Sequence, residues 1–177
     1  YTFVGKGNGG YLPIRYIPIP ELRQVGNFLI TAEPFDDLIL NLELAGSLYD
    51  RNRLSAVDDT DNGGYARNIE LKLNPKKIEV GDLSLGKIGF SYKDRFKQDK
   101  YESIDRIDNV EFNRDYNLTD QTRVNEELRE IGINLIPVDE LNVRSKYGFL
   151  KRGNIFESNR YLTNVSLTKQ DAYNFIY

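Results

Sequence analysis

The amino-acid sequence predicts an all-β fold, an antiparallel up-and-down sheet of roughly eight or nine long strands. The first observation behind this prediction is strict alternation of apolar and polar residues from residue 38 to residue 48. The second is the recurrence of the same pattern around three prolines further along the chain, and the third is a contrast between short turns and long polar connections. We expect this antiparallel β domain to span residues 21–177.

Residues 1–20 are expected to form an extended N-terminal arm or loop. They contain three of the six prolines and four of the fourteen glycines. This density of proline and glycine disfavours a packed helix or strand.

The first predicted hairpin runs from Leu29 to Asp50. Side chains of a strand point to opposite faces in turn, so the alternation in the second arm places an apolar face on that strand. The leucines of this face are Leu38, Leu40, Leu42, Leu44 and Leu48.

Three prolines, Pro34, Pro75 and Pro137, each end a run of apolar alternation and are followed by charged residues. Proline cannot donate a hydrogen bond to a ladder and favours turns, so we expect tight hairpin turns at these positions, all at one end of the sheet. The stretches 51–64 and 93–106 have the composition of long exposed loops at the other end.

The remaining strands are predicted from the same alternation. They are expected within 68–73, 87–92, 109–118, 141–149 and 161–168. One stretch, 119–130, instead places Val124, Leu128 and Ile131 at helical spacing, so a short helix is expected there.

An amphipathic sheet buries its apolar face either against lipid, around a barrel, or against a second sheet, in a soluble β-sandwich. Leu38 to Leu48 is ten steps, which at ~3.3 Å per residue and a tilt of ~40° rises roughly 25 Å. That height matches the apolar band of an outer-membrane barrel, whereas strands of soluble domains are more often five or six residues long. The prediction is therefore a closed transmembrane barrel or a segment of a larger one, with the soluble β-sandwich as the alternative.

Tyrosine and phenylalanine gather near the predicted strand ends, where the aromatic girdles of a barrel meet the membrane interfaces. The last five residues, Tyr173 to Tyr177, have aromatic side chains at the last, third-last and fifth-last positions. Together with the alternating strands and short turns, these features resemble bacterial outer-membrane β-barrel proteins and, more loosely, uncharacterised surface proteins of Bacteroidota. The resemblance implies contact with membrane lipid, an outer-membrane location and a terminal strand that is recognised during barrel assembly.

Composition argues against catalysis and against nucleic acid. Histidine and cysteine are absent, which removes the imidazole base, the thiolate nucleophile and the usual nitrogen and sulfur metal ligands. Asp105, Asp108 and Glu111 could in principle supply a carboxylate pair for glycoside hydrolysis, but no second constellation supports them, and we expect neither enzyme activity nor a cofactor. The net charge of -3 provides no basic field for nucleic acid.

Calcium is the one metal that the sequence suggests. Asp58, Asp59 and Asp61 supply oxygen ligands at close spacing ahead of Gly63, which is part of the pattern of a calcium loop. The twelfth position counted from Asp58 is Ile69, where an EF-hand needs a glutamate, so a solvated turn-rich loop explains the stretch better.

The expected function is that of a non-catalytic outer-membrane β-barrel component with a structural, pore or secretion-related role. Its long loops would be open to a protein or carbohydrate partner. The alternative is a secreted or cell-surface β-sandwich module that binds carbohydrate or protein. The sequence contains no methionine, so a removed signal peptide or an origin inside a longer protein is expected.

Overall fold

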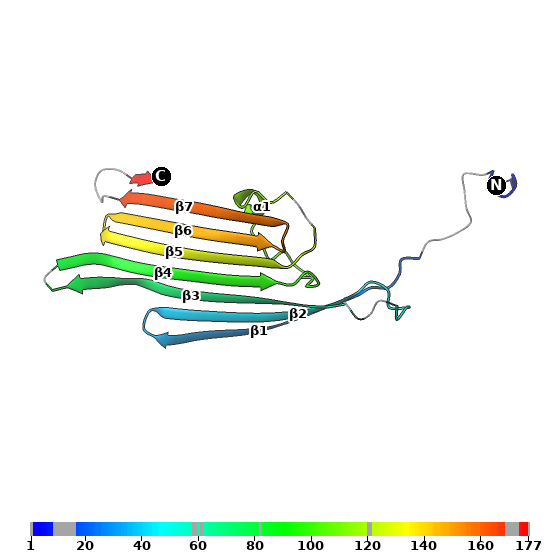
Figure 1. Ribbon diagram of the computed structural model, residues 1–177, viewed down its shortest axis with the longest axis horizontal. Helices are drawn as coiled ribbons and strands as arrows, with labels where there is room; N and C mark the ends of the chain where they lie inside the picture. The colour runs from blue at the N-terminus through cyan, green and yellow to red at the C-terminus, as the bar shows by residue number, and fades with distance from the viewer. Residues whose placement is uncertain are drawn as a thin grey trace.

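The computed structural model describes residues 2–8, 17–57, 60, 62–81, 83–119, 122–168 and 174–176. It confirms an all-β antiparallel up-and-down fold, because each strand pairs with its neighbour in the sequence within a single sheet (Figure 1). The strands are β1 (Leu22–Phe35), β2 (Leu38–Asp50), β3 (Gly63–Val80), β4 (Leu83–Lys97), β5 (Glu126–Val138), β6 (Leu141–Arg152), β7 (Phe156–Thr168) and β8 (Asn174–Ile176). The first seven are long, between the 12 residues of β6 and the 18 of β3, and β8 has only three.

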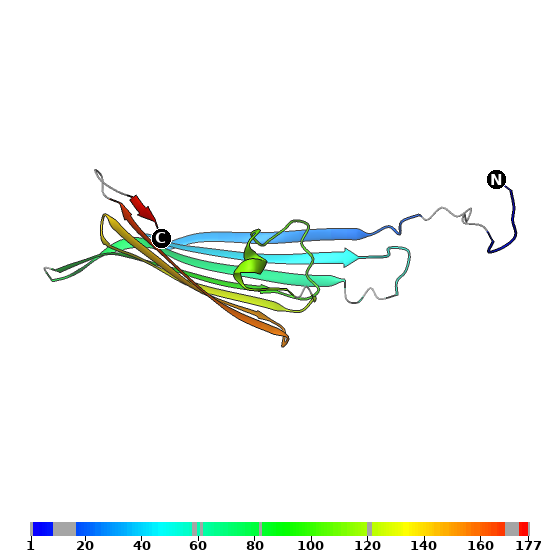
Figure 2. The same cartoon turned by 90° about the horizontal axis from the view of Figure 1, so that it is seen from above.

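The sheet is open. Within the described residues β1 pairs with β2 alone, and no ladder joins β1 to β7 or β8. The expectation of a closed barrel is therefore not met by this chain. Figure 2 shows a twisted sheet in which blue β1 and orange β7 are apart at the end with the long connections.

The three hairpin turns lie at one end of the sheet, as expected (Figure 1). At the other end the connections 51–62 and 98–125 are long, but residues 153–155 form a short turn between β6 and β7, and the predicted loops 51–64 and 93–106 are shortened because β3 begins at Gly63 and β4 ends at Lys97. Two residues separate β1 from β2, and two separate β5 from β6. In the first of these turns Asp37 has a φ of 68°, a conformation that aspartate tolerates better than most residues.

The prolines do not form the turns. Each lies inside a strand, at a point where the register of the ladder shifts: Pro34 between Ala32 and Phe35, Pro75 between Leu73 and Lys76, and Pro137 between Leu135 and Val138. A β-bulge leaves a residue without its ladder bond, so it accommodates a residue that has no N–H. Because proline lacks an N–H, it fits these bulges, and it does not form the predicted turns.

The connection from β4 to β5 differs most from the expectation. Residues 109–118, predicted to be a strand, contain instead the short helix α1 (Phe112–Asp115), and the predicted helix over 119–130 overlaps the start of β5. The apolar side chains of this region pack on the sheet: Phe112 and Tyr116 form one buried cluster with Leu128 and Leu150. Because Leu128 belongs to β5, its helical spacing from Val124 and Ile131 is coincidental.

Candidate functional site

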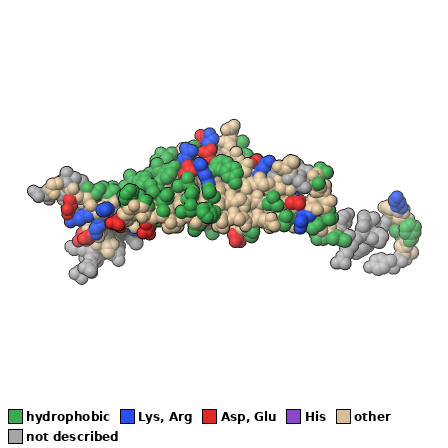
Figure 3. Space-filling view, turned by 90° about the horizontal axis from the view of Figure 1, so that it is seen from below, with side chains coloured by type: hydrophobic (Ala, Val, Ile, Leu, Met, Phe, Trp, Pro, Cys, Tyr) green, Lys and Arg blue, Asp and Glu red, His purple; other side chains and the backbone are tan. Residues whose placement is uncertain are grey.

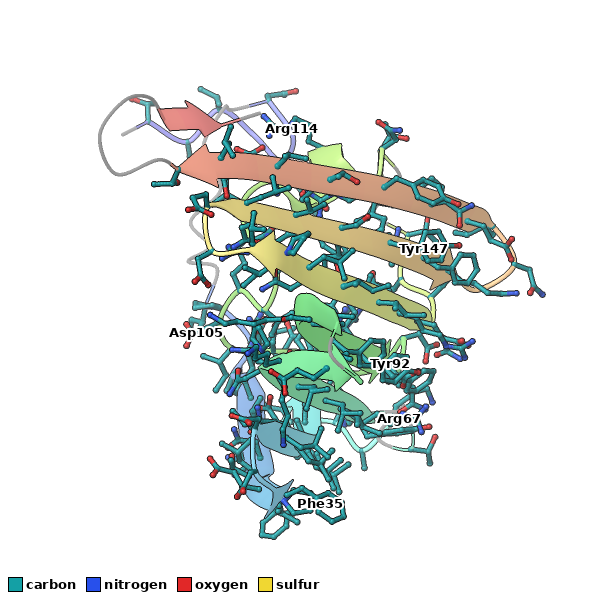
Figure 4. The ribbon with its side chains drawn as sticks, turned by 90° about the vertical axis from the view of Figure 1, so that its left-hand side faces the viewer. Phe35, Arg67, Tyr92, Asp105, Arg114 and Tyr147 are labelled. Carbon is teal, nitrogen blue, oxygen red and sulfur yellow. The ribbon has the colours of Figure 1, made fainter. Side chains whose placement is uncertain are left out.

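The two faces of the sheet differ in chemistry. One, the apolar face, carries the alternate residues of β2 from Leu38 to Leu48, and the ladders place Ile69, Tyr92 and Tyr147 on the same side. The other, the polar face, carries the residues between them. In Figure 4 the side chains of Tyr92 and Tyr147 lie on one side of the sheet, while Asp105 and Arg114, from the connection between β4 and β5, lie on the opposite side.

Burial is inverted relative to that chemistry. Every buried strand residue that the structure describes lies on the polar face, and none lies on the apolar face. The buried strand residues are Ser47, Gly89, Glu126, Leu128, Gly132, Gly148, Leu150 and Arg152. By contrast Phe28, Ile133 and Tyr161 of the apolar face are 61%, 47% and 79% exposed.

The exposed surface is correspondingly large. The accessible surface of the chain is 13740 Å², against about 8,900 Å² for a compact monomer of this mass. The uncovered sheet contributes to the excess, since large hydrophobic side chains of its strands, such as Phe28 and Tyr161, are exposed. Figure 3, which views the molecule from the β1 edge, shows hydrophobic side chains gathered in a continuous patch between the hairpin end and the middle of the molecule.

The hairpins are staggered in a regular way. Leu38, the first residue of β2, is level with Ser145 on β6. The first residue of β6 is Leu141, so the starts of these two strands are offset by four residues. The residues that connect them across the ladder are Leu73, Phe90 and Ile133. Four residues along a strand are about 13 Å, and four strand spacings across the sheet are about 19 Å. If the line through the turns is taken as the rim of the sheet, the strands are tilted by about 35° from the perpendicular to that rim. Strands of outer-membrane barrels are tilted by about 35–45°.

The apolar face ends in aromatic and ion-paired residues on the side of the long connections. Two ring pairs lie there, Tyr65 with Phe96 at 5.4 Å between centroids and Tyr147 with Tyr161 at 4.9 Å. On β3, β4 and β5 this face also carries the charged residues Arg67, Asp94 and Arg129, and Asp94 accepts from both arginines at 3.2 Å. On β6 the apolar stretch from Leu141 to Phe149 is eight steps, or about 22 Å of height at the tilt derived above.

The polar face is partly covered by the connection between β4 and β5, residues 98–125, which we call the inner segment. It is attached to strands across the sheet. At one side the backbone N–H of Glu102 donates to Oγ of Ser47 on β2 (2.9 Å), and at the other Asp115 pairs with Arg160 on β7 (2.8 Å).

Two glycines of the polar face provide room for the inner segment. A Cβ atom at Gly148 would lie 2.1 Å from the hydroxyl oxygen of Tyr116, and one at Gly64 would lie 2.2 Å from the backbone nitrogen of Tyr101. Both tyrosines are buried. A glycine inside a strand is what such a close approach requires, so the sheet is shaped to receive the segment at two separate points.

The hydroxyl of Tyr116 is held by charge. It donates to Oε1 of Glu130 at 3.0 Å, and Oε2 of the same carboxylate pairs with Lys146 at 2.7 Å. Burial, together with the neighbouring Glu130 carboxylate, raises the pKa of Tyr116 well above its usual range. Burial also raises the pKa of Tyr101, with a smaller contribution from Glu43.

A network centred on Glu126 links three strands to the inner segment. Glu126 is 3% exposed, and its carboxylate lies 2.9 Å from Arg95, 3.2 Å from Arg152 and 3.6 Å from Lys97. Arg95 also pairs with Asp108 of the segment at 2.6 Å, with its guanidinium 5.2 Å from the Phe112 ring centroid. A buried charge is tolerated away from water when it is paired with opposite charges, and the three cations around Glu126 provide that pairing.

The sequence-predicted acidic residues do not converge on a reaction site. Asp108 is engaged by Arg95, and Glu111 by Arg114 at 3.0 Å. The predicted calcium ligands, Asp58, Asp59 and Asp61, lie outside the described residues. Within the part of the chain that the structure describes, no three acidic residues come together as a metal site would require.

Beyond the inner segment, the polar face contains a hollow of about 310 Å³ between β3 and β7. Its charged lining residues are Lys72, Arg144 and Lys146, and no aspartate or glutamate lines it. The backbone of Gly132 forms part of its wall, where a Cβ atom would come within 2.4 Å of the Ser91 hydroxyl.

No family model, curated protein or solved structure matches this chain. Among the described residues, no helix has the length and apolar character needed to cross a membrane.

Proposed function

We propose that this chain forms part of the wall of a bacterial outer-membrane β-barrel, with its apolar face toward lipid and its polar face toward the lumen. Its role is structural, pore-forming or secretion-related, and non-catalytic. The observation that carries the proposal is the inverted burial: every buried strand residue that the structure describes lies on the polar face, and none lies on the apolar face. Lipid is the environment in which that distribution is stable, because it needs no second protein layer on the apolar side.

The size of the apolar face supports this assignment. Seven strands at about 4.8 Å each and a height of about 22 Å give roughly 700 Å², above the ~300–600 Å² of the largest apolar patch on a typical soluble monomer. The aromatic pairs and the Asp94 ion pairs at one border of this face correspond to the level of a membrane interface.

The stagger of the hairpins supports it further. A tilt near 35° is what places the three turns on one rim of a barrel. The short turns then face the periplasm and the long connections face the cell exterior. β8 pairs with only the last three residues of β7. Because open edges are costly in hydrocarbon, the complete barrel includes further strands beside β1 and along the rest of β7.

Extraction and gel migration test the proposal. A barrel component is expected to need detergent for extraction from bacterial membranes and to migrate differently on SDS gels before and after boiling. A protein that stays in the aqueous fraction and shows no such shift would refute the proposal. It would support instead the alternative of a secreted or surface β-sandwich module that binds carbohydrate or protein.

A further inference from the structure

The polar face is divided into two halves with different charge balance. Under the inner segment, cations are matched by carboxylates: Arg95 and Arg152 by Glu126, and Arg160 by Asp115. In the hollow beyond the segment the match fails. Of its three cations only Lys146 has a carboxylate partner, Glu130.

Lys72 and Arg144 are the unmatched pair. Neither makes an ion pair with any residue that the structure describes, and both side chains are exposed on the rim of the hollow. Glu70, the nearest carboxylate to Lys72 along β3, is already paired with Lys93 at 2.9 Å. The hollow therefore keeps two free positive charges on opposite sides of one concave surface.

The geometry suits a small molecule. Lys72 is on β3 and Arg144 on β6, three strand spacings apart and offset by two residues, because the ladder places Lys72 level with Lys146. Their backbones are therefore roughly 16 Å from each other. Both are long side chains that can reach inward from the two rims, and Gly132 between them adds no side chain to fill the space. An ammonium and a guanidinium that line the same cavity are the groups that bind phosphate and carboxylate.

We propose that this hollow binds small solutes that carry phosphate or carboxylate groups, with Lys72 and Arg144 as the anion-binding residues. The location of this hollow beside a solute path rests on the proposed barrel, in which the polar face borders the lumen. Binding itself requires only the hollow and its two cations.

The test is calorimetric titration of the full chain with pyrophosphate at low ionic strength. The double variant Lys72→Gln, Arg144→Gln is compared with a control of equal charge, Arg51→Gln, Arg53→Gln, whose two residues are exposed in the connection between β2 and β3 and do not line the hollow. We expect about tenfold weaker binding in the first variant and less than about a twofold change in the control. Equal weakening in both variants, or no heat with the unaltered chain, would overturn the proposal.

A second readout separates this test from that of the barrel. Circular dichroism first establishes that both variants retain the β spectrum of the parent, and the boiling shift on SDS gels is recorded for the same preparations. Pyrophosphate binding that depends on Lys72 and Arg144 in a protein without a boiling shift upholds the site and refutes the membrane wall. A boiling shift without such binding does the reverse.

Discussion

Replacing Gly148 with alanine tests how the inner segment is seated on the sheet. The new Cβ atom would lie 2.1 Å from the Tyr116 hydroxyl oxygen, 3.1 Å from Cζ and 3.4 Å from Cε1. The two groups cannot coexist at the first of these distances, so Tyr116 must leave its site. Its ring is 1% exposed, and loss of a buried aromatic of this size costs about 3–5 kcal/mol.

The Tyr116→Phe background changes that result in a specific way. Without the hydroxyl, the closest contact of the alanine becomes the 3.1 Å contact with Cζ, which small shifts relieve. Tyr116→Phe alone should cost about 1.5–3 kcal/mol for the lost hydrogen bond to the Glu130 carboxylate. The two substitutions should therefore be strongly non-additive, with Gly148→Ala at least ~1 kcal/mol less damaging in the phenylalanine background.

The assay is denaturant unfolding of the four chains, with trypsin cleavage at the basic residues of the inner segment as a local probe. Gly26→Ala is the matched control, since nothing lies within 4 Å of a Cβ atom built at Gly26. If Gly148→Ala behaves like Gly26→Ala, or has the same effect in both backgrounds, Tyr116 does not occupy the space over Gly148.

Three further outcomes are expected. Leu42→Arg on the apolar face should destabilise the protein in detergent or lipid by about 2–4 kcal/mol and Asn41→Lys on the polar face should have little effect; equal effects in urea unfolding would contradict the assigned facing. The raised pKa of Tyr116 keeps its phenol neutral in the folded protein, whereas unfolded tyrosine ionises near pH 10, so stability present below about pH 10 should be lost as the pH rises above it. Unfolding measured between about pH 9 and 11 should show a steeper loss for the parent than for Tyr116→Phe, and parallel curves would refute this linkage. Glu126→Gln should lower the free energy of unfolding by about 3–5 kcal/mol because it leaves buried cations unmatched. Glu157→Gln, which removes the carboxylate of an exposed pair with Lys151, should lower it by less than about 1 kcal/mol. Similar melting temperatures for the two variants would show that the Glu126 network is not structural.

Most of the strands and the facing of their side chains could be predicted because they depend on local pattern, whereas the predicted strand over 109–118 and the predicted helix over 119–130 were wrong. The alternation from Leu38 to Leu48 predicts one strand with an apolar face, and β2 is that strand. Proline is ambiguous at the same level, since a turn and a bulge both accept a residue without an N–H. Pro75 shows the difference, because β3 continues beyond it to Val80.

The inner segment could not be predicted from local pattern. Its attachment depends on contacts between residues far apart in the sequence, such as Tyr101 with Gly64 and Tyr116 with Gly148. The available signal was Gly148 inside an otherwise regular predicted strand, which marks a close approach but does not identify the partner. Gly64 gave no such signal, because it lies in a stretch predicted to be a loop. The charge balance of the hollow is likewise invisible until β3 and β6 are placed in one sheet.

The most direct test of the lipid-facing surface is a spin-label scan of β2 in lipid bilayers. The chain contains no cysteine, so single cysteines can be introduced and labelled at each position from Leu38 to Leu44. We expect accessibility to dissolved oxygen to peak at Leu38, Leu40, Leu42 and Leu44, with accessibility to a water-soluble nickel reagent at the positions between them. Labels at the leucine positions that are shielded from both reagents, as under a second sheet, or that are open to the nickel reagent, would contradict a lipid-facing wall.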